Sequence, residues 1–158
     1  MKTLGFFVIM IGTYFIGITA FGHEKEAAAA YRRVHSAECH YYYDDAGSTV
    51  YNGAYLVMGA TGRAVYCPAP SDSELPHAST TTLNVHGYSP AANSAYSETC
   101  AKQYNTAMLT CGGLSYWAAG YGGVYGVDVA AWADAAAMPM VYNFLPANAQ
   151  LFGFYMAN

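Results

Sequence analysis

The feature that most constrains the fold of this 158-residue chain is a set of four cysteines behind an apolar N-terminal segment: Cys39, Cys67, Cys100 and Cys111. An even number of cysteines in an exported chain is typical of two disulfides, which four cysteines can form in three connectivities. The simplest of the three pairs nearest neighbours, Cys39 with Cys67 and Cys100 with Cys111. No two of these cysteines have the close spacing of a zinc site, so we expect neither a metal nor a cofactor.

The N-terminal segment has the character of a targeting or anchoring element. Lys2 precedes an uncharged stretch, residues 4–21, that is rich in Phe, Ile, Val and Leu. A positive start followed by an apolar run predicts a secretory signal peptide, and the run is also close to the length of a membrane-spanning helix. We therefore predict that residues 1–30 are a signal peptide or membrane anchor and that residues 31–158 form one domain. The protein is then expected to be secreted, periplasmic or on the cell surface, with membrane contact only through residues 4–21 if the leader is retained.

The same segment also resembles, in part, the start of a type IV prepilin. Gly5-Phe6 precedes the long apolar run, as in that family. The family normally has a Glu at the fifth mature position, and this chain has Met10 there instead. The departure weakens the alternative that the chain is a filament subunit.

The body of the chain has the pattern of short strands. In residues 80–88, Leu83 and Val85 alternate with Asn84 and His86, which is the period of a half-buried antiparallel strand. Further strands are predicted at residues 48–57, 62–67, 96–104, 124–129, 140–145 and 151–156. The last two are near-continuous apolar runs with a short Pro-containing connection between them, and we expect them to form a hairpin.

About eight short strands separated by Gly, Pro and Ser predict an all-β domain, an antiparallel β-sandwich with jelly-roll-like or immunoglobulin-like connections. Residues 129–137 are the one stretch of the domain that favours helix, with Asp128 as a cap before Met138-Pro139 ends it. The net charge of −4, with few Lys and Arg, argues against a nucleic-acid partner.

Short motifs between residue 67 and the C-terminus carry a family resemblance. They are Cys67-Pro68-Ala69-Pro70-Ser71-Asp72, Leu75-Pro76-His77-Ala78, Thr81-Thr82-Leu83-Asn84-Val85-His86-Gly87-Tyr88, Cys100, Cys111-Gly112, Trp132, Leu145-Pro146 and Leu151-Phe152-Gly153. In these motifs the chain resembles a group of uncharacterised small exported bacterial β-sandwich proteins. The resemblance covers residue 37 to the end. It implies a compact exported domain with paired cysteines, and it implies no activity.

Aromatic residues are the most informative surplus, since 16 of the residues are tyrosines. Tyr116, Trp117, Tyr121 and Tyr125 lie in a glycine-rich stretch, and we predict that they bind a ligand. An aromatic ring on a rigid sheet combines an apolar body with a polar tip, so it can stack on a sugar ring or on another protein. Exposed aromatic patches often mark interaction surfaces.

Two polar clusters allow a metal-binding alternative. His35, Glu38 and His40 lie close together in sequence, and residues 72–74 place two carboxylates in a proline-bounded loop. A histidine pair with a carboxylate suits a transition metal, and a carboxylate loop suits Ca²⁺. We expect the simpler outcome for both: the histidine cluster is a solvated edge, and the carboxylate loop is a solvated turn.

These observations predict a non-catalytic surface or binding module for a glycan or a cell-surface protein. The alternative is a structural subunit of a coat or pilus-like filament, which would self-associate. A small secreted hydrolase is a third hypothesis, which would need Ser, His and Asp to meet in the fold. The chain has no Gly-x-Ser-x-Gly elbow and no His-Glu-x-x-His helix, so we expect no enzyme.

Overall fold

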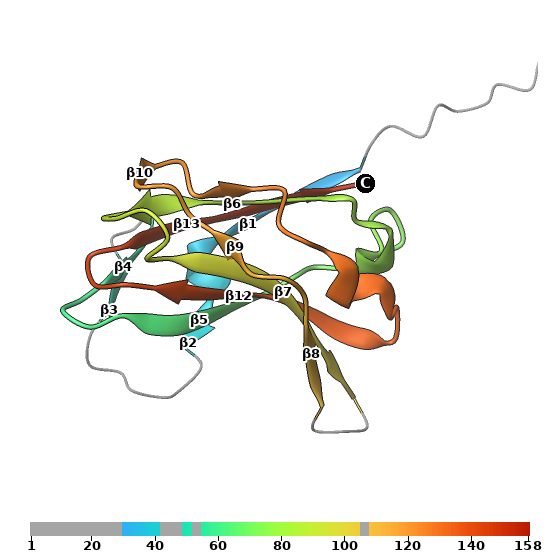
Figure 1. Ribbon diagram of the computed structural model, residues 1–158. Coiled ribbons are helices and arrows are strands. Elements are labelled where there is room, and N and C mark those ends of the chain that lie inside the picture. Colours follow the sequence, from blue (N-terminus) through green and yellow to red (C-terminus); the bar gives the residue numbers. More distant parts are fainter. Residues whose placement is uncertain (1–29, 42–48, 52–54, 105–107) are drawn as a thin grey trace, which may run out of the picture.

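The chain forms two antiparallel β-sheets that pack face to face as a sandwich (Figure 1). The computed structural model describes residues 30–41, 49–51, 55–104 and 108–158. The described helices are three short 3-10 turns: η1 (Ser36–Glu38), η2 (His77–Ser79) and η3 (Ala130–Ala133). None of the helices in these ranges is long and apolar enough to cross a membrane. The predicted leader, residues 1–30, lies outside the described ranges except for its last residue, Ala30.

One sheet has seven strands and is centred on β13. Its members are β1 (Tyr31–His35), β3 (Thr49–Tyr51), β4 (Leu56–Met58), β6 (Thr82–Ser89), β10 (Gly120–Tyr121), β11 (Val124–Tyr125) and β13 (Gln150–Ala157). The order across the sheet is β10-β6-β13-β4-β3, while β11 also pairs with β6 and β1 also pairs with β13. Strand β13 therefore has β6 along one edge and both β1 and β4 along the other.

The second sheet has six strands and is centred on β12. Its members are β2 (His40–Tyr41), β5 (Arg63–Pro68), β7 (Tyr96–Gln103), β8 (Leu109–Cys111), β9 (Ser115–Tyr116) and β12 (Ala137–Leu145). The order is β2-β5-β12-β7-β8, and β9 also pairs with β7. The chain passes from one sheet to the other between β5 and β6, between β6 and β7, and again between β12 and β13, whereas β7 and β12 are neighbours in one sheet.

The predicted hairpin between the last two strands is wrong, because β12 and β13 lie in different sheets. The short connection after Leu145 crosses the sandwich, with Asn148 in a left-handed conformation at φ 63°. Buried and partly exposed residues alternate from Val141 to the end of β12 and along the first part of β13, and Leu145 and Leu151 are each completely buried. The apolar runs of these strands thus combine a buried inner face with aromatic residues on the outer face.

The predicted helix at residues 129–137 is reduced to the single turn η3. The N-cap residue is Val129, which forms no side-chain cap, whereas Asp128 lies one residue earlier and its carboxylate accepts a hydrogen bond from the amide of Ala130 over 2.9 Å. The turn ends at Ala133, and Ala137 already begins β12. Pro139 is then part of a strand instead of a helix terminator.

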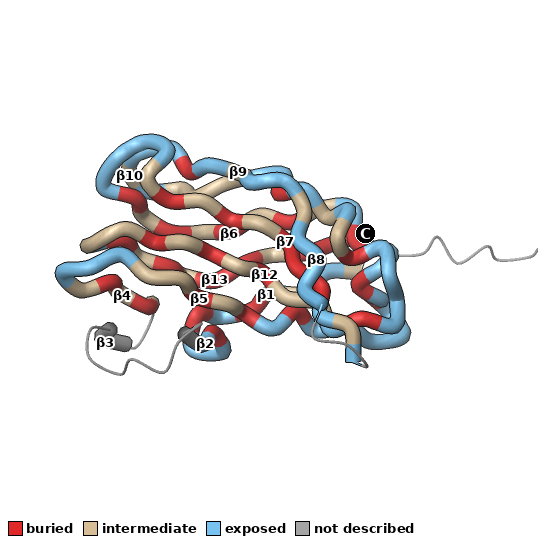
Figure 2. Tube along the Cα trace, turned by 60° about the horizontal axis from the view of Figure 1, so that its bottom comes forward, coloured by how far each residue is buried: buried red, intermediate tan, exposed pale blue. Residues whose placement is uncertain are grey.

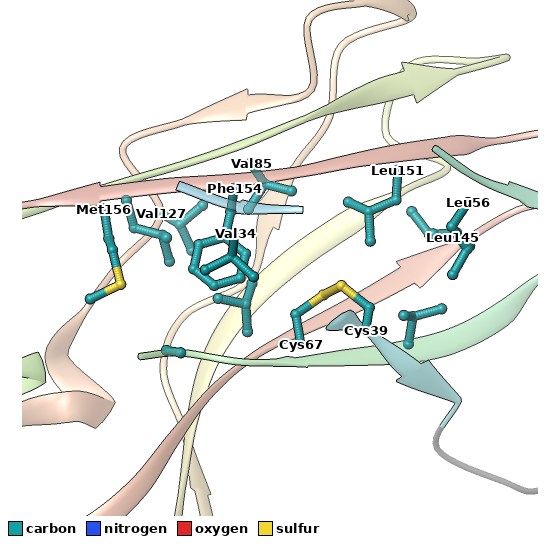
Figure 3. Close-up of a cluster of buried hydrophobic side chains, with 14 of the residues drawn as sticks. Val34, Cys39, Leu56, Cys67, Val85, Val127, Leu145, Leu151, Phe154 and Met156 are labelled. Carbon is teal, nitrogen blue, oxygen red and sulfur yellow. A yellow bond between two sulfur atoms is a disulfide. The ribbon is translucent and has the colours of Figure 1, made fainter. Parts of the chain in front are cut away.

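Aliphatic and aromatic side chains from the inner faces of both sheets form the core (Figure 3). The largest fully buried ones include Leu56, Leu83, Leu145, Leu151 and Met156. At about 25 cal/mol per Å² of apolar surface, burial of each such side chain stabilises the fold by roughly 1.5–3 kcal/mol. This buried layer holds the two sheets rigid, so their outer faces present side chains in fixed positions.

The cysteines form the nearest-neighbour disulfides, Cys39–Cys67 and Cys100–Cys111, with sequence separations of 28 and 11 residues. Cys39–Cys67 lies inside the core beneath the inner face of β13 (Figure 3). Cys100 and Cys111 are register partners on β7 and β8, so the second disulfide joins adjacent strands. Two disulfides indicate folding in an oxidising, extracellular type of environment.

Candidate functional site

The seven-stranded sheet presents a row of aromatic side chains on its outer surface. Buried and partly exposed residues alternate along β6, so each inward residue is followed by an outward one (Figure 2). We call the outward set the aromatic face, and define it as Tyr31, Tyr55, His86, Tyr88, Tyr121, Tyr125, Phe152 and Tyr155. Its rings come from β1, β6, β10, β11, β13 and the residue before β4, so the sheet pairing brings together residues far apart in the sequence.

Tyr121 occupies one end of the aromatic face. Its ring centroid lies 4.9 Å from that of Tyr88 and 6.2 Å from that of Phe152, and the Tyr121 and Phe152 rings are within 15° of parallel. Tyr55 contacts Phe152 edge-on with a centroid distance of 5.6 Å. Tyr121 is nevertheless 76% exposed. The result is a broad aromatic platform that is fixed by its neighbours and open to solvent.

A second ring stack occupies the other end of the same face. The rings of Tyr31 and Tyr155 lie 5.9 Å apart and 29° from parallel. The Arg33 guanidinium lies 5.9 Å from the centre of the Tyr31 ring, within the range of a cation–π interaction. Nearby, His86 meets Tyr125 edge-on with a centroid distance of 5.6 Å.

Between the two stacks the surface is hollowed into a groove of about 490 Å³, which we call the β13 groove. It is lined by Arg33, Val34, His35, His86, Phe152, Gly153, Phe154 and Tyr155. The hollow has a simple cause, because Gly153 is the register partner of both His35 and His86 and has no side chain between them. A volume of this size lies within the range of ligand-binding clefts.

A β-bulge in β13 shapes the floor of the groove. The pairing with β6 shifts register between Leu151 and Gly153, and Gly153 has a φ of 140°. A Cβ atom at this position would collide with the carbonyl oxygen of Val34. Only glycine therefore allows β1 to approach this closely, and bulges of this kind are common beside binding sites.

The nitrogen-bearing side chains that line the groove, Arg33, His35 and His86, can donate hydrogen bonds into it. The backbone amide of Ala37 donates to Nδ1 of His35 over 3.0 Å, so the proton of the neutral ring is on Nε2. Arg33 and His86 provide further N–H groups. None of the eight lining residues is acidic.

The loop with two carboxylates, residues 72–74, lies beside β1 and is engaged by Arg32. The guanidinium donates to Asp72 and to Glu74, each with one contact of 3.0 Å. The amides of Glu74 and Leu75 also donate to Asp72. The hydrogen bond from the Leu75 amide is the largest cause that lowers the pKa of Asp72, and the hydrogen bond from Arg32 is the next largest. Because these carboxylates are paired with Arg32 and with backbone amides, the conformation of the loop is explained by contacts within the protein.

The four predicted ligand-binding aromatics are divided by the fold. Tyr121 and Tyr125 lie on the aromatic face and are 76% and 65% exposed. Tyr116 is 51% exposed but lies on β9 of the six-stranded sheet, where its ring contacts Tyr96. Two of the four therefore lie at one site, and Tyr116 belongs to the opposite surface.

For Trp117 the prediction is wrong, because this side chain is completely buried. Its indole Nε1 donates to the hydroxyl of Ser97 over 2.8 Å. Gly87 leaves the space for it, since a Cβ there would collide with the indole ring. Trp117 stabilises the core and is out of reach of a ligand.

The six-stranded sheet has aromatic residues on its outer surface as well. The rings of Tyr96 and Phe144 are stacked at 5.4 Å, and Tyr142 lies 6.3 Å from Tyr96. Burial raises the pKa of Glu98, which is the register partner of Tyr142. Glu98 also lies close to the sulfurs of Cys100 and Cys111, but the disulfide leaves neither sulfur free to bind a metal.

No sequence motif marks the cationic part of the groove. His35 belongs to the predicted cluster with Glu38 and His40, and Arg33 belongs to none of the predicted sites. Alternation along residues 31–35 places Tyr31, Arg33 and His35 on one side of a strand, which was a usable signal. His86 was assigned to the outer side of its strand, as the structure has it.

His77 is buried and has a structural environment. Its Nδ1 lies 3.0 Å from the hydroxyl of Ser71, and its Nε2 lies 2.9 Å from the carbonyl oxygen of Asp134. Both ring nitrogens are therefore used within the fold.

Comparison with protein-family models, curated proteins and solved structures found no match. The resemblance to small exported bacterial sandwich proteins accordingly stays a prediction.

Proposed function

We propose that the chain is an exported, non-catalytic jelly-roll domain that binds carbohydrate through its aromatic face. The strand order supports this class. One sheet runs β4-β13-β6 and then β10 or β11, the other runs β5-β12-β7 and then β8 or β9, and the chain passes back and forth between them. Two such four-strand orders define a jelly roll, an architecture used by lectin domains.

The observation that carries the proposal is the exposure of Tyr121 together with its near-parallel alignment with Phe152. A ring that is 76% exposed gains little from burial within the fold. Its neighbours nevertheless hold it in one orientation, so little conformational entropy is lost when a ligand stacks on it. Sugar rings have apolar faces that match such a platform, and the adjacent groove provides N–H donors for hydroxyl groups.

The test is a binding screen of the oxidised full chain against glycans and insoluble polysaccharides, followed by titration of the best ligand. Tyr121→Ala is expected to lower affinity by about tenfold or more, because loss of an aromatic hot-spot contact costs about 2 kcal/mol or more and about 1.4 kcal/mol corresponds to tenfold. Tyr116→Ala is the matched control, since it removes an exposed tyrosine from the opposite sheet. Equal affinities for the two variants would contradict the proposal.

A second candidate function is assembly into a coat or filament. It is favoured by the stacked aromatic residues on the outer surface of the six-stranded sheet, which give the molecule apolar surfaces on both sides. Concentration-dependent sedimentation of the oxidised protein, together with a negative glycan screen, would support assembly over carbohydrate binding. If the ligand is instead a specific cell-surface protein, the aromatic face is still the proposed binding surface.

A further inference from the structure

We propose that the β13 groove binds the acidic group, a carboxylate or sulfate, of an anionic carbohydrate. The inference rests on the proposed function and specifies the class of glycan.

The charge of the groove is opposite to that of the whole chain. The chain has a net charge of −4, yet the titratable side chains that line the groove, apart from the Tyr155 phenol, are Arg33, His35 and His86. A concentration of cationic and N–H groups on an otherwise acidic protein favours an anionic ligand at that position.

Carboxylates elsewhere in the described part of the chain do not neutralise Arg33. Asp72 and Glu74 form ion pairs with Arg32, which extends from the neighbouring position on β1. Asp128 accepts hydrogen bonds from the amides of Gly113 and Ala130. Within the described ranges Arg33 forms no ion pair, and its guanidinium lies over the face of the Tyr31 ring.

The donors are arranged on both sides of the glycine floor. His35 and His86 flank Gly153 from β1 and β6. Arg33 lies on the same face of β1, two residues before His35. His35 has its Nδ1 occupied by the Ala37 amide, which leaves Nε2–H as the donor. A guanidinium can bind a carboxylate or sulfate through two parallel hydrogen bonds, so Arg33 is the principal recognition residue.

Continuity with the aromatic platform favours a sugar over an acidic peptide. Phe152 lines the groove and also stacks with Tyr121, while Tyr155 lines it and stacks with Tyr31. A ligand in the groove is therefore flanked by flat aromatic surfaces at both ends. Linked pyranose rings that carry an acidic substituent combine the two features this surface offers, ring faces for stacking and an anion for Arg33.

The experiment compares matched acidic and neutral ligands by calorimetric titration of the oxidised full chain. The probes are oligogalacturonate with its methyl ester, and one sulfated oligosaccharide with its desulfated form. At least one acidic form is expected to bind about tenfold more tightly than its neutral partner. Arg33→Gln is expected to abolish that preference, and Arg33→Lys to restore part of it, because a charge-assisted hydrogen bond is stronger than a neutral one.

Lys102→Gln is the control for charge alone, since it removes one exposed positive charge at β7 on the other sheet. It is expected to leave the preference unchanged, and loss of the preference in this variant would overturn the assignment to the groove. The unfolding midpoint of each variant confirms that the exposed substitutions leave the fold intact.

The outcomes separate the inference from the proposed function. Equal binding of acidic and neutral forms, with both weakened by Tyr121→Ala, would overturn the acidic-ligand inference and leave carbohydrate binding standing. Binding of neither form, with no other glycan bound, would overturn both. Polyglutamate that binds as tightly as the acidic sugars through Arg33 would overturn the assignment of the ligand as a carbohydrate.

Discussion

The hydroxyl of Ser97 connects two large polar groups inside the core. It accepts a hydrogen bond from the indole of Trp117 over 2.8 Å and donates to the side-chain oxygen of Asn143 over 2.6 Å. Ser97→Ala would leave a buried N–H and a buried amide oxygen without this partner, so we expect a loss of about 2–4 kcal/mol of stability. Urea unfolding measures the change.

Ser79→Ala is the matched control, because the Ser79 hydroxyl is exposed and donates to the Pro76 carbonyl over 2.8 Å. That variant is expected to lose less than about 0.5 kcal/mol. If both variants unfold at the same urea concentration, the buried hydrogen bonds of Ser97 do not contribute to stability.

Trp117 shows where prediction from residue patterns fails. Tyr116 and Trp117 are adjacent, so an extended backbone must point them in opposite directions, but glycine-rich flanks give no pattern that says which points inward. The answer depends on Gly87, which is 30 positions away in sequence and leaves room for the indole ring. By contrast, the alternation at Leu83 and Val85 correctly predicted the inner face of β6.

At the scale of elements, the two disulfides stabilise different parts of the fold and differ in accessibility. Cys39–Cys67 closes the longer loop and is buried, whereas Cys111 of the second disulfide is exposed. Loop-closure entropy predicts that removing Cys39–Cys67 costs about 3.6 kcal/mol, and removing Cys100–Cys111 about 2.8 kcal/mol. Paired Cys→Ala variants and thermal unfolding test this order.

Mild reduction of the native protein adds a kinetic test, since a thiolate must reach a sulfur atom to cleave a disulfide. Cys100–Cys111 is expected to open first, and mass spectrometry after alkylation identifies the cysteines released. An unchanged melting temperature after complete reduction would show that neither disulfide stabilises the domain.

Strand positions were predictable from local pattern, but strand partners were not. Residues 62–67 and 80–88 match β5 and β6 closely because period-two alternation is a local signal. The pairing of β12 with β5 and β7 depends on contacts between residues up to 82 positions apart, such as Arg63 with Leu145. Such long-range pairings leave no mark in a short window, which is why sequence proximity wrongly suggested a hairpin.

For the whole molecule, composition and spacing predicted a sandwich because many half-buried strands can bury their apolar faces only by packing two sheets together. The outer faces were not predictable to the same degree. Tyr31, Tyr88 and Phe152 come from three separate strands, and only the register of β1, β6 and β13 brings them onto one surface. The aromatic surplus was visible in the sequence, while its division between two sheets was a property of the fold.

Acid is expected to destabilise the molecule through the carboxylates that the fold engages. Hydrogen bonds from backbone amides lower the pKa of Asp72 and of Asp128, and Arg32 lowers that of Asp72 further. A carboxylate with a lowered pKa in the folded state stabilises the fold above its unfolded pKa, and this contribution is lost as the pH falls through the folded value. The melting temperature should therefore fall below about pH 4, where carboxylates begin to protonate.

The Asp72→Asn variant tests this mechanism, because Asp72 joins the loop after β5 to Arg32 on β1. The variant should melt at a lower temperature than the wild type at pH 7, and the difference should shrink as the pH is lowered towards 2. Glu98 has the opposite effect on stability in acid, because burial raises its pKa and its protonation therefore favours the folded state. Glu98→Gln removes this contribution, so it should make the fall of the melting temperature in acid steeper. A constant gap between the Asp72→Asn and wild-type melting curves at every pH would mean that titration of Asp72 does not drive the acid response.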